Sequence, residues 1–148
     1  MIYFGFTYCP DVCPVSLMKV AKALDKIKES KEYAYFDLVP IFVSVDPDRD
    51  SNERIDEYTK IFHPDMVGLT HKKNDSPELK SILKSFKIHV SKIFLTEEDE
   101  KEDLESLKEN APVVLEKMQE MDRKEKVEKT QDTSYTLDHT IVVYLMGP

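Results

Sequence analysis

The only two cysteines of the 148-residue chain lie close together, in the stretch FGFTYCPDVCP at residues 4–14. Three residues separate Cys9 from Cys13, and a proline follows each cysteine directly. Two sulfurs at this spacing could bind one metal ion or form a disulfide, which joins Cα atoms about 5.5 Å apart. Cysteines four residues apart also occur by chance on helices, where each packs as a small hydrophobic residue. The prolines favour a functional pair, because they predict an adaptable loop that can bring the sulfurs together.

The prolines also predict how the pair meets the helix that follows. A residue before proline avoids helical geometry, whereas proline suits the first position of a helix. We therefore expect Cys13 to be the N-cap of a helix that begins at Pro14, with Cys9 in the loop ahead of it. The unpaired N–H groups and partial positive charge of a helix N-terminus stabilise a thiolate. This position predicts a lowered cysteine pKa, which suits either metal binding or disulfide exchange.

A metal site needs a third ligand, and the chain offers four histidines, with methionines as softer alternatives. We interpret His63 at a helix end, His71 in a lysine-rich loop and His89 after a helix as structural or solvated residues. His139 begins the last apolar run, where a hydrogen bond to the backbone would explain it and a ligand role would explain it better. Side chains alternate along a strand, so Asp138 should face away from His139 and serve as a turn residue or a support. Two thiolates and an imidazole suit Cu(I) and accept Cu(II), whereas structural zinc normally takes four ligands.

These residues must be positioned by elements that alternate between strands and helices. Apolar runs of β type predict four strands, at residues 1–7, 39–46, 66–70 and 140–146. Apolar residues at spacings of three and four predict three helices, from Pro14 to about Glu29, after Asp50 and from Ser76. Such alternation implies a largely parallel sheet covered by helices, with functional residues at the carboxyl ends of the strands. The cysteine loop lies at such an end.

Short polar signals predict where the second and third helices begin. Asp50 followed by Glu53 matches a capping box, and Ser76 followed by Pro77 matches an N-cap and a first helical position. A turn and this cap explain the stretch SVDPDRD at residues 44–50. The alternative is that this stretch forms a wall of the cysteine site or a docking surface.

Composition and charge limit the class of protein. With 41% hydrophobic and 34% charged residues, a chain of this length predicts one soluble domain. Residues 97–129 hold 13 acidic and 7 basic side chains, which account for most of the net charge of −8. The nearly neutral remainder does not support nucleic-acid binding, which needs a basic face. We interpret residues 96–134 as an exposed, Lys/Glu-rich acidic insertion, partly helical and partly disordered, in which Pro112 interrupts any helix.

Three blocks of this sequence together resemble the SCO (SCO/SenC) family of copper chaperones for cytochrome c oxidase assembly. They are YFGFTYCPDVCPVSL, PIFVSVDPDRDSNERIDEYTKIFHPDMVGLT and DHTIVVYLMGP. The resemblance implies a thioredoxin-like, three-layer α/β domain that binds one copper ion through Cys9, Cys13 and His139. It also implies an upstream copper donor chaperone and two possible acts on oxidase subunit II. These are copper delivery to its binuclear copper site and reduction of the cysteines of that site.

The resemblance also raises expectations about what surrounds the site. Tyr8 stands where many members of the family have histidine. The insertion before Asp138 is longer than is usual in the family, so we expect the segment that carries His139 to be mobile. We expect the family's amino-terminal hairpin, membrane anchor, last strand and last helix to be missing, so that residues 1–148 form one truncated domain. The phrase FHPDMVGLT resembles mitochondrial members, which predicts the inner membrane facing the intermembrane space, with the periplasmic side of a bacterial membrane as the alternative.

Two hypotheses for function follow from these residues. In the first, the protein is a copper chaperone whose thiolate pair and His139 hold Cu(I) and pass it on by ligand exchange. In the second, it is a thiol–disulfide oxidoreductase, which needs the cysteine pair and no histidine. A peroxidase-like thiol enzyme ranks last, because no arginine is evident beside the cysteines.

Overall fold

The computed structural model describes residues 1–30, 37–74, 76–94, 96–125 and 135–146. In chain order the elements of these ranges are β1 (Ile2–Gly5), α1 (Val12–Lys28), β2 (Ile41–Ser44), α2 (Asn52–Phe62), β3 (Val67–Leu69), α3 (Pro77–Ser85), β4 (Val90–Ile93), α4 (Glu97–Asn110), α5 (Pro112–Glu125), β5 (Thr136–His139) and β6 (Val143–Tyr144). The order confirms the predicted alternation of strands and helices up to α3. Among the helices of these ranges, none combines the length and the apolar character needed to cross a bilayer.

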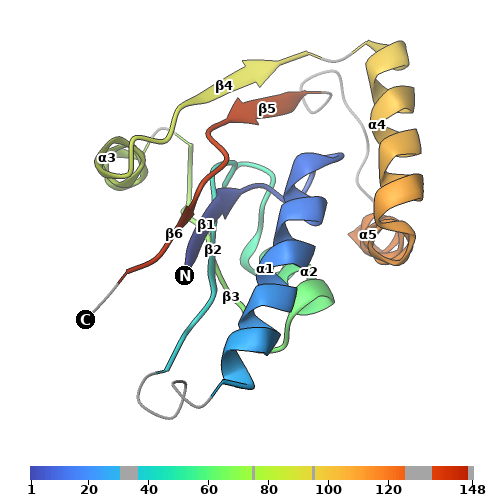
Figure 1. Ribbon diagram of the computed structural model, residues 1–148. Coiled ribbons are helices and arrows are strands. Elements are labelled where there is room, and N and C mark those ends of the chain that lie inside the picture. Colours follow the sequence, from blue (N-terminus) through green and yellow to red (C-terminus); the bar gives the residue numbers. More distant parts are fainter. Residues whose placement is uncertain (31–36, 75, 95, 126–134, 147–148) are drawn as a thin grey trace.

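Four strands form the central sheet, in the order β3-β2-β1-β6. β1 pairs in parallel with β2, and β2 pairs in parallel with β3, whereas β6 runs antiparallel to β1. Figure 1 shows α1 and α2 on one side of this sheet and α3 on the other. The arrangement confirms the expected α/β domain of three layers with a mainly parallel sheet.

Successive side chains of β1 pack against different layers, as the alternation of a strand requires. The ring of Tyr3 lies 6.2 Å from that of Phe42 in β2, and Phe42 in turn lies 5.6 Å from Tyr58 of α2. Phe4 points to the opposite face, where its ring lies 5.2 Å from that of Phe86, directly after α3. β1 is therefore buried on both faces, as its apolar run predicts.

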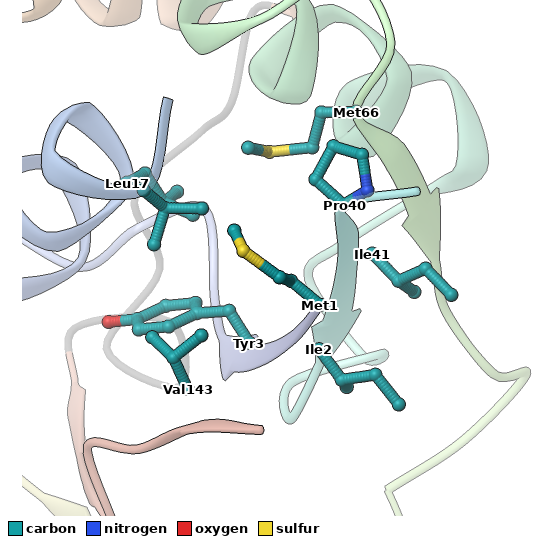
Figure 2. A pocket seen from close by; sticks show the side chains of 9 residues that line it. Met1, Ile2, Tyr3, Leu17, Pro40, Ile41, Met66 and Val143 are labelled. Carbon is teal, nitrogen blue, oxygen red and sulfur yellow. The ribbon is translucent and has the colours of Figure 1, made fainter. Parts of the chain in front are cut away.

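A small apolar pocket at the amino end of β1 shows the same alternation (Figure 2). Met1, Leu17 and Met66 point toward one another, whereas Ile2 and Ile41 point away from them. The pocket lies at the opposite end of β1 from the cysteine loop.

The start of α1 differs from the prediction by two residues. The helix begins at Val12 with Asp11 as its N-cap, so Cys13 is the second helical residue and not the cap. Pro14 is tolerated as the third, because the first N–H groups of a helix have no intrahelical partner to lose. The shift turns the N–H of Cys13 into one of these unpaired donors.

The cap of α2 is Ser51, and the prediction of a capping box at Asp50 is wrong. The backbone N–H of Arg54 donates to the Ser51 hydroxyl at 3.1 Å. Asp50 is instead buried, where its carboxylate accepts hydrogen bonds from the hydroxyl groups of Thr7 and Ser44, each at 2.6 Å. This carboxylate therefore ties the loop after β1 to β2. In α3, by contrast, the predicted cap and first proline are both confirmed.

The charged segment that begins at residue 96 is helical and packs against the rest of the domain. α5 begins at Pro112 directly after α4, as the proline predicts. Apolar side chains at spacings of three and four are buried along both helices: Leu107, Ala111, Val114, Met118 and Met121. α5 packs against α2 and α4, so the segment is helical and largely exposed as expected, but its apolar side is buried, which the expectation did not include. Residues 126–134, expected to belong to the same insertion, lie outside the described ranges.

A second, two-stranded sheet carries His139, and the sequence pattern did not predict it. β4 and β5 pair antiparallel, with Val90 opposite His139 and Ile93 opposite Thr136. We refer to this pair of strands as the ribbon. His139 is therefore the last residue of β5 and not the first residue of the final strand, which is only the short β6. Within the described residues, the ribbon shares no hydrogen-bonded ladder with the central sheet.

Candidate metal centre

Cys9 and Cys13 meet where β1 leads into α1. Cys9 lies in the loop after the carboxyl end of β1, and Cys13 lies in the first turn of α1. The backbone N–H of Cys13 donates to the sulfur of Cys9 at 3.3 Å. An unpaired donor of the helix N-terminus thus points at a sulfur, as the sequence predicted in general terms. Both cysteines are free thiols.

Gly5 makes room for the sulfur of Cys13 beside β1. A Cβ atom at Gly5 would lie 3.0 Å from the Cys13 sulfur and 3.0 Å from ring atoms of both Tyr3 and Phe42. These distances are shorter than ordinary van der Waals contacts, so a larger residue would have to displace its neighbours. The absence of a side chain at this one strand position therefore sets where Cys13 can lie.

His139 reaches the same place from the ribbon. Its Nε2 lies 3.3 Å from the sulfur of Cys13, and its Nδ1 lies 3.2 Å from the carbonyl oxygen of Thr140. A carbonyl oxygen can only accept a hydrogen bond, so we assign the ring proton to Nδ1. That assignment leaves the lone pair of Nε2 directed at the sulfur. Phe6 packs edge-on against the imidazole at 5.8 Å, and Asp138 is exposed, as strand alternation predicts.

The three side chains form a compact and buried cluster. The ligand atoms of Cys9, Cys13 and His139 all lie within 4.8 Å of one another. The three residues are 5%, 0% and 7% exposed, respectively. No fourth histidine, cysteine, aspartate or glutamate joins the cluster among the residues that the structure describes. Two sulfurs and one imidazole fit a low-coordinate soft ion such as Cu(I) better than structural zinc.

The two thiols differ in acidity. A hydrogen bond from the Cys13 side chain lowers the pKa of Cys9 to about 5 against the effect of burial, with further help from backbone N–H groups. Burial raises the pKa of Cys13, and its hydrogen bond with Cys9 and the negative charge on that residue raise it further. At neutral pH the metal-free site therefore holds one thiolate, on Cys9, and one thiol, on Cys13.

The other three histidines lie outside this cluster, as predicted. His63 accepts a hydrogen bond from the backbone N–H of Asp65 at 3.0 Å through its Nδ1. His71 lies 3.7 Å from a carboxylate oxygen of Glu78, and His89 is exposed next to the ribbon. Their positions support structural or solvated roles.

Two arginines beside the cysteine loop were missed in the sequence. The guanidinium of Arg54 lies 3.7 Å from the ring centroid of Tyr8, the residue before Cys9. That of Arg49 lies 5.0 Å from Tyr8 and 3.6 Å from the ring of Tyr135. The available signal was the topology, because carboxyl ends of neighbouring parallel strands meet at one edge of a sheet. The contacts support the alternative interpretation of residues 44–50 as a wall of the cysteine site.

Comparison with known proteins places these features in a family context. A family model described as SCO1/SenC matches residues 1–120. The protein named "Protein SCO1 homolog 1, mitochondrial" from Arabidopsis thaliana is 38% identical over all 148 residues of this chain, which cover 32% of its own length. "Protein SCO1 homolog, mitochondrial" from Homo sapiens is 34% identical over the same 148 residues, which cover 36% of its length. The chain thus spans about a third of the length of these relatives.

A solved structure shows the same architecture. The crystal structure of Arabidopsis thaliana ScoI with copper bound matches with a TM-score of 0.60 and 35% sequence identity. The match covers 95% of this chain and 62% of that chain. The likeness confirms the thioredoxin-like fold expected from the sequence.

Proposed function

The chain belongs to the SCO1/SenC family, and from this premise we propose that it is a copper chaperone whose site consists of Cys9, Cys13 and His139. The observation that carries the proposal is the buried cluster itself, in which three soft or borderline ligand atoms lie within 4.8 Å of one another. The copper-bound ScoI structure from Arabidopsis thaliana supports copper as the ion. Three donors and the exclusion of water favour Cu(I), which accepts low coordination numbers.

The destination of the copper belongs to the same proposal. The chaperone receives copper from an upstream donor and delivers it to the binuclear copper site of cytochrome c oxidase subunit II during oxidase assembly. Delivery proceeds by ligand exchange, in which an incoming thiolate binds the ion as one of the three ligands leaves, so that the ion is never without donors. The proposed location is the inner mitochondrial membrane, facing the intermembrane space; the two relatives named as mitochondrial support the organelle.

Copper stoichiometry tests the ligand set. We expect one copper ion per chain after anaerobic reconstitution with Cu(I). The variants Cys9→Ser, Cys13→Ser and His139→Ala should each bind it more weakly, because each removes one of three donors. His89→Ala is the matched control, since this exposed histidine adjoins the ribbon without joining the cluster. Undiminished binding in the three ligand variants would remove the basis for the assignment.

A second candidate function is thiol–disulfide oxidoreductase, acting on the cysteines of the same subunit II site. The unequal acidity of the two thiols favours it. A thiolate on Cys9 can attack a target disulfide and release one target thiolate, which can take the proton of Cys13 so that the Cys13 sulfur resolves the mixed disulfide. Both protein thiols are oxidised to a disulfide in this reaction, and the target cystine is reduced to two thiols.

The histidine separates the two candidates. Reduced protein should be mixed with a disulfide-bonded peptide that carries the cysteine pair of subunit II, and the rate of peptide reduction should be measured. An oxidoreductase would reduce the peptide catalytically in the presence of excess dithiol, and His139→Ala would leave that rate unchanged. A chaperone would instead show slow reduction and a copper transfer rate that depends on His139.

A further inference from the structure

The position of His139 depends on how the ribbon docks onto the domain. The two cysteines are fixed by β1 and α1, which belong to the main body of the fold. In the part of the chain that the structure describes, the ribbon shares no ladder with the central sheet, and only β6, beyond His139, pairs with β1. Contacts at the amino end of β5 can therefore determine the position of His139 at its carboxyl end, because a short strand transmits a shift from one end to the other.

Tyr135, directly before β5, makes three contacts with the loop that follows β2. Its backbone carbonyl oxygen accepts a hydrogen bond from Nη1 of Arg49 at 2.7 Å. Its hydroxyl donates to Oδ1 of Asp46 at 2.8 Å. Its ring lies under the guanidinium of Arg49, whose central carbon is 3.6 Å from the ring centroid. Backbone, hydroxyl and ring of this residue are thus all engaged by the loop that follows β2.

Arg49 is itself held in place beside the cysteine loop. Its Nε donates to Oδ2 of Asp46 at 2.5 Å, in an ion pair that is almost wholly buried. Its guanidinium also lies 5.8 Å from the ring centroid of Phe6 and 5.0 Å from that of Tyr8, which both precede Cys9. One guanidinium therefore touches the loop that carries a sulfur ligand and the strand that carries the imidazole.

We propose that Asp46, Arg49 and Tyr135 form a clamp that positions His139 and thereby sets how long copper stays in the site. The inference rests on the proposed copper-binding function. The three residues act through His139 and do not touch the ion. With the clamp closed, the ribbon holds the imidazole against the sulfurs. With the clamp open, β5 moves, the imidazole leaves, and the dithiolate alone retains the ion.

The clamp explains how a buried site could release its cargo. The ligand atoms are shielded from water, so an acceptor needs an opening movement to reach the ion. Moving the ribbon removes one ligand and uncovers the ion in the same step, whereas Cys13 belongs to the first turn of α1 and cannot move away without unwinding that turn. Arg49 and Tyr135 are therefore positioning residues for copper exchange.

A double-mutant cycle on copper release tests the clamp. Cu(I)-loaded protein is mixed with an excess of a chromophoric Cu(I) chelator, and the release rate is measured for the wild type, Arg49→Gln, His139→Ala and the double variant. We expect Arg49→Gln to speed release about 10- to 100-fold, the range found when residues that support metal ligands are replaced. The double variant should release copper no faster than His139→Ala alone, because the clamp acts only through that imidazole. Tyr135→Phe, which keeps the ring and loses the hydroxyl, should show a smaller acceleration.

A spectroscopic readout separates positioning from general loss of stability. In the Cu(II)-loaded wild type, electron paramagnetic resonance should show nitrogen coupling from one imidazole, and Arg49→Gln should lose that coupling in part or in full. Ile55→Val, a core change where α2 packs on Gly68 of β3, controls for destabilisation, and Arg123→Gln controls for the loss of an exposed arginine. Neither control should alter release or coupling. The proposal would be overturned if the accelerations of copper release by Arg49→Gln and His139→Ala multiplied in the double variant. Unchanged nitrogen coupling in Arg49→Gln would also overturn it.

A copper-free measurement keeps the clamp testable if the wild type binds no copper. That outcome would defeat the proposed function, and hydrogen exchange of the β5 backbone amides would then decide the clamp by itself. The bond from the Thr140 N–H to the His89 carbonyl oxygen sets which amides of β5 face β4, namely those of Thr136 and Asp138. Arg49→Gln should raise the exchange rates at these two amides about tenfold relative to Ile55→Val, because freeing one end of a ribbon promotes local opening. Equal exchange in the two variants would show that Arg49 does not hold the ribbon.

Discussion

Gly5 is the residue on which the position of the Cys13 sulfur depends most directly. We expect Gly5→Ala to cost about 1–3 kcal/mol of the free energy of unfolding, as overpacked cores do, and to shift the sulfur away from β1. Copper affinity should fall in the same variant. Both quantities can be measured, by urea unfolding of the metal-free protein and by competition with a Cu(I) chelator.

Gly68 supplies the matched control for Gly5. A Cβ atom there would lie 1.9 Å from Cγ2 of Ile55, a closer approach than any at Gly5. Gly68→Ala should therefore destabilise the fold at least as much, yet leave copper affinity nearly unchanged in the folded protein. If both glycine variants lose affinity in proportion to their loss of stability, Gly5 has no specific role at the site.

The two thiols differ in acidity and should ionise at different pH. The pKa of Cys9 is lowered to about 5, so the metal-free reduced protein should gain one thiolate as pH rises through about 5. Cys13, whose pKa is raised, should stay protonated beyond pH 8. Thiolate absorbance near 240 nm follows both events. In Cys13→Ala the step should move to higher pH, because the hydrogen bond from Cys13 is the main cause of the shift.

The stability linked to the Cys9 thiol has a definite sign. A thiol whose folded pKa is lowered stabilises the folded state at high pH, and this contribution is lost as pH falls toward the folded value. The loss should therefore extend from about pH 8.5 down to about pH 5 for Cys9. Cys9→Ser should have a flatter stability profile over this window than the wild type. A single titration step for both thiols near pH 8.5 would contradict the assignment.

Two adjacent valines of α5 lie in different surroundings. Val114 is 6% exposed and Val113 is 64% exposed. We expect Val114→Ala to cost about 1.5–3 kcal/mol of the free energy of unfolding, because it removes buried apolar surface. Val113→Ala should stay within about 0.5 kcal/mol of the wild type. Chemical denaturation of the two variants compares them directly, and equal stabilities would mean that α5 does not pack as described.

The strands β1, β2 and β3 and the first three helices could be predicted because each has a continuous apolar run or one clear apolar face. The packing of α4 and α5 was missed because charged residues dominate their composition. The signal was nevertheless present, since Leu107, Val114 and Met121 recur every seven residues and Met118 falls between them. Only the spacing of the apolar residues, read without regard to the charges, predicts that these helices are buried on one side.

The ribbon could not be predicted in the same way. β4 has the sequence VSKI and β5 the sequence TLDH, which are short, half polar and far apart in the chain. Neither segment has the apolar run that a fully buried strand shows, and their pairing is a tertiary choice. Sequence therefore identified His139 as the third ligand candidate and failed to identify the element that presents it. The helix start at Val12 could not be predicted from Pro14, because proline fits any of the first helical positions, whose N–H groups have no intrahelical partner.

At the scale of the whole molecule, copper should stabilise the fold because its ligands come from distant parts of the chain. Cys13 and His139 are separated by 126 positions. An ion that binds only the folded state raises the melting temperature by mass action, and free Cu(I) at about 100 times Kd should raise it by about 5–10 °C in a domain of this size. Thermal unfolding followed by circular dichroism measures the shift. Cys9→Ser should show a much smaller rise, and a rise of the same size would exclude coordination by this cluster.

Because the ligands lie far apart in the chain, they become available in a definite order as the chain folds. Both sulfur donors belong to the first turn and loop after β1, whereas the nitrogen donor becomes available only when β5 has paired with β4. In a nascent or partly folded chain, the two thiols are therefore exposed without the imidazole. An oxidant can convert them to a disulfide before His139 reaches the site. Copper binding by all three ligands consequently requires a reductant and a fully folded domain. A peptide that contains only the CPDVCP motif should not reproduce this binding.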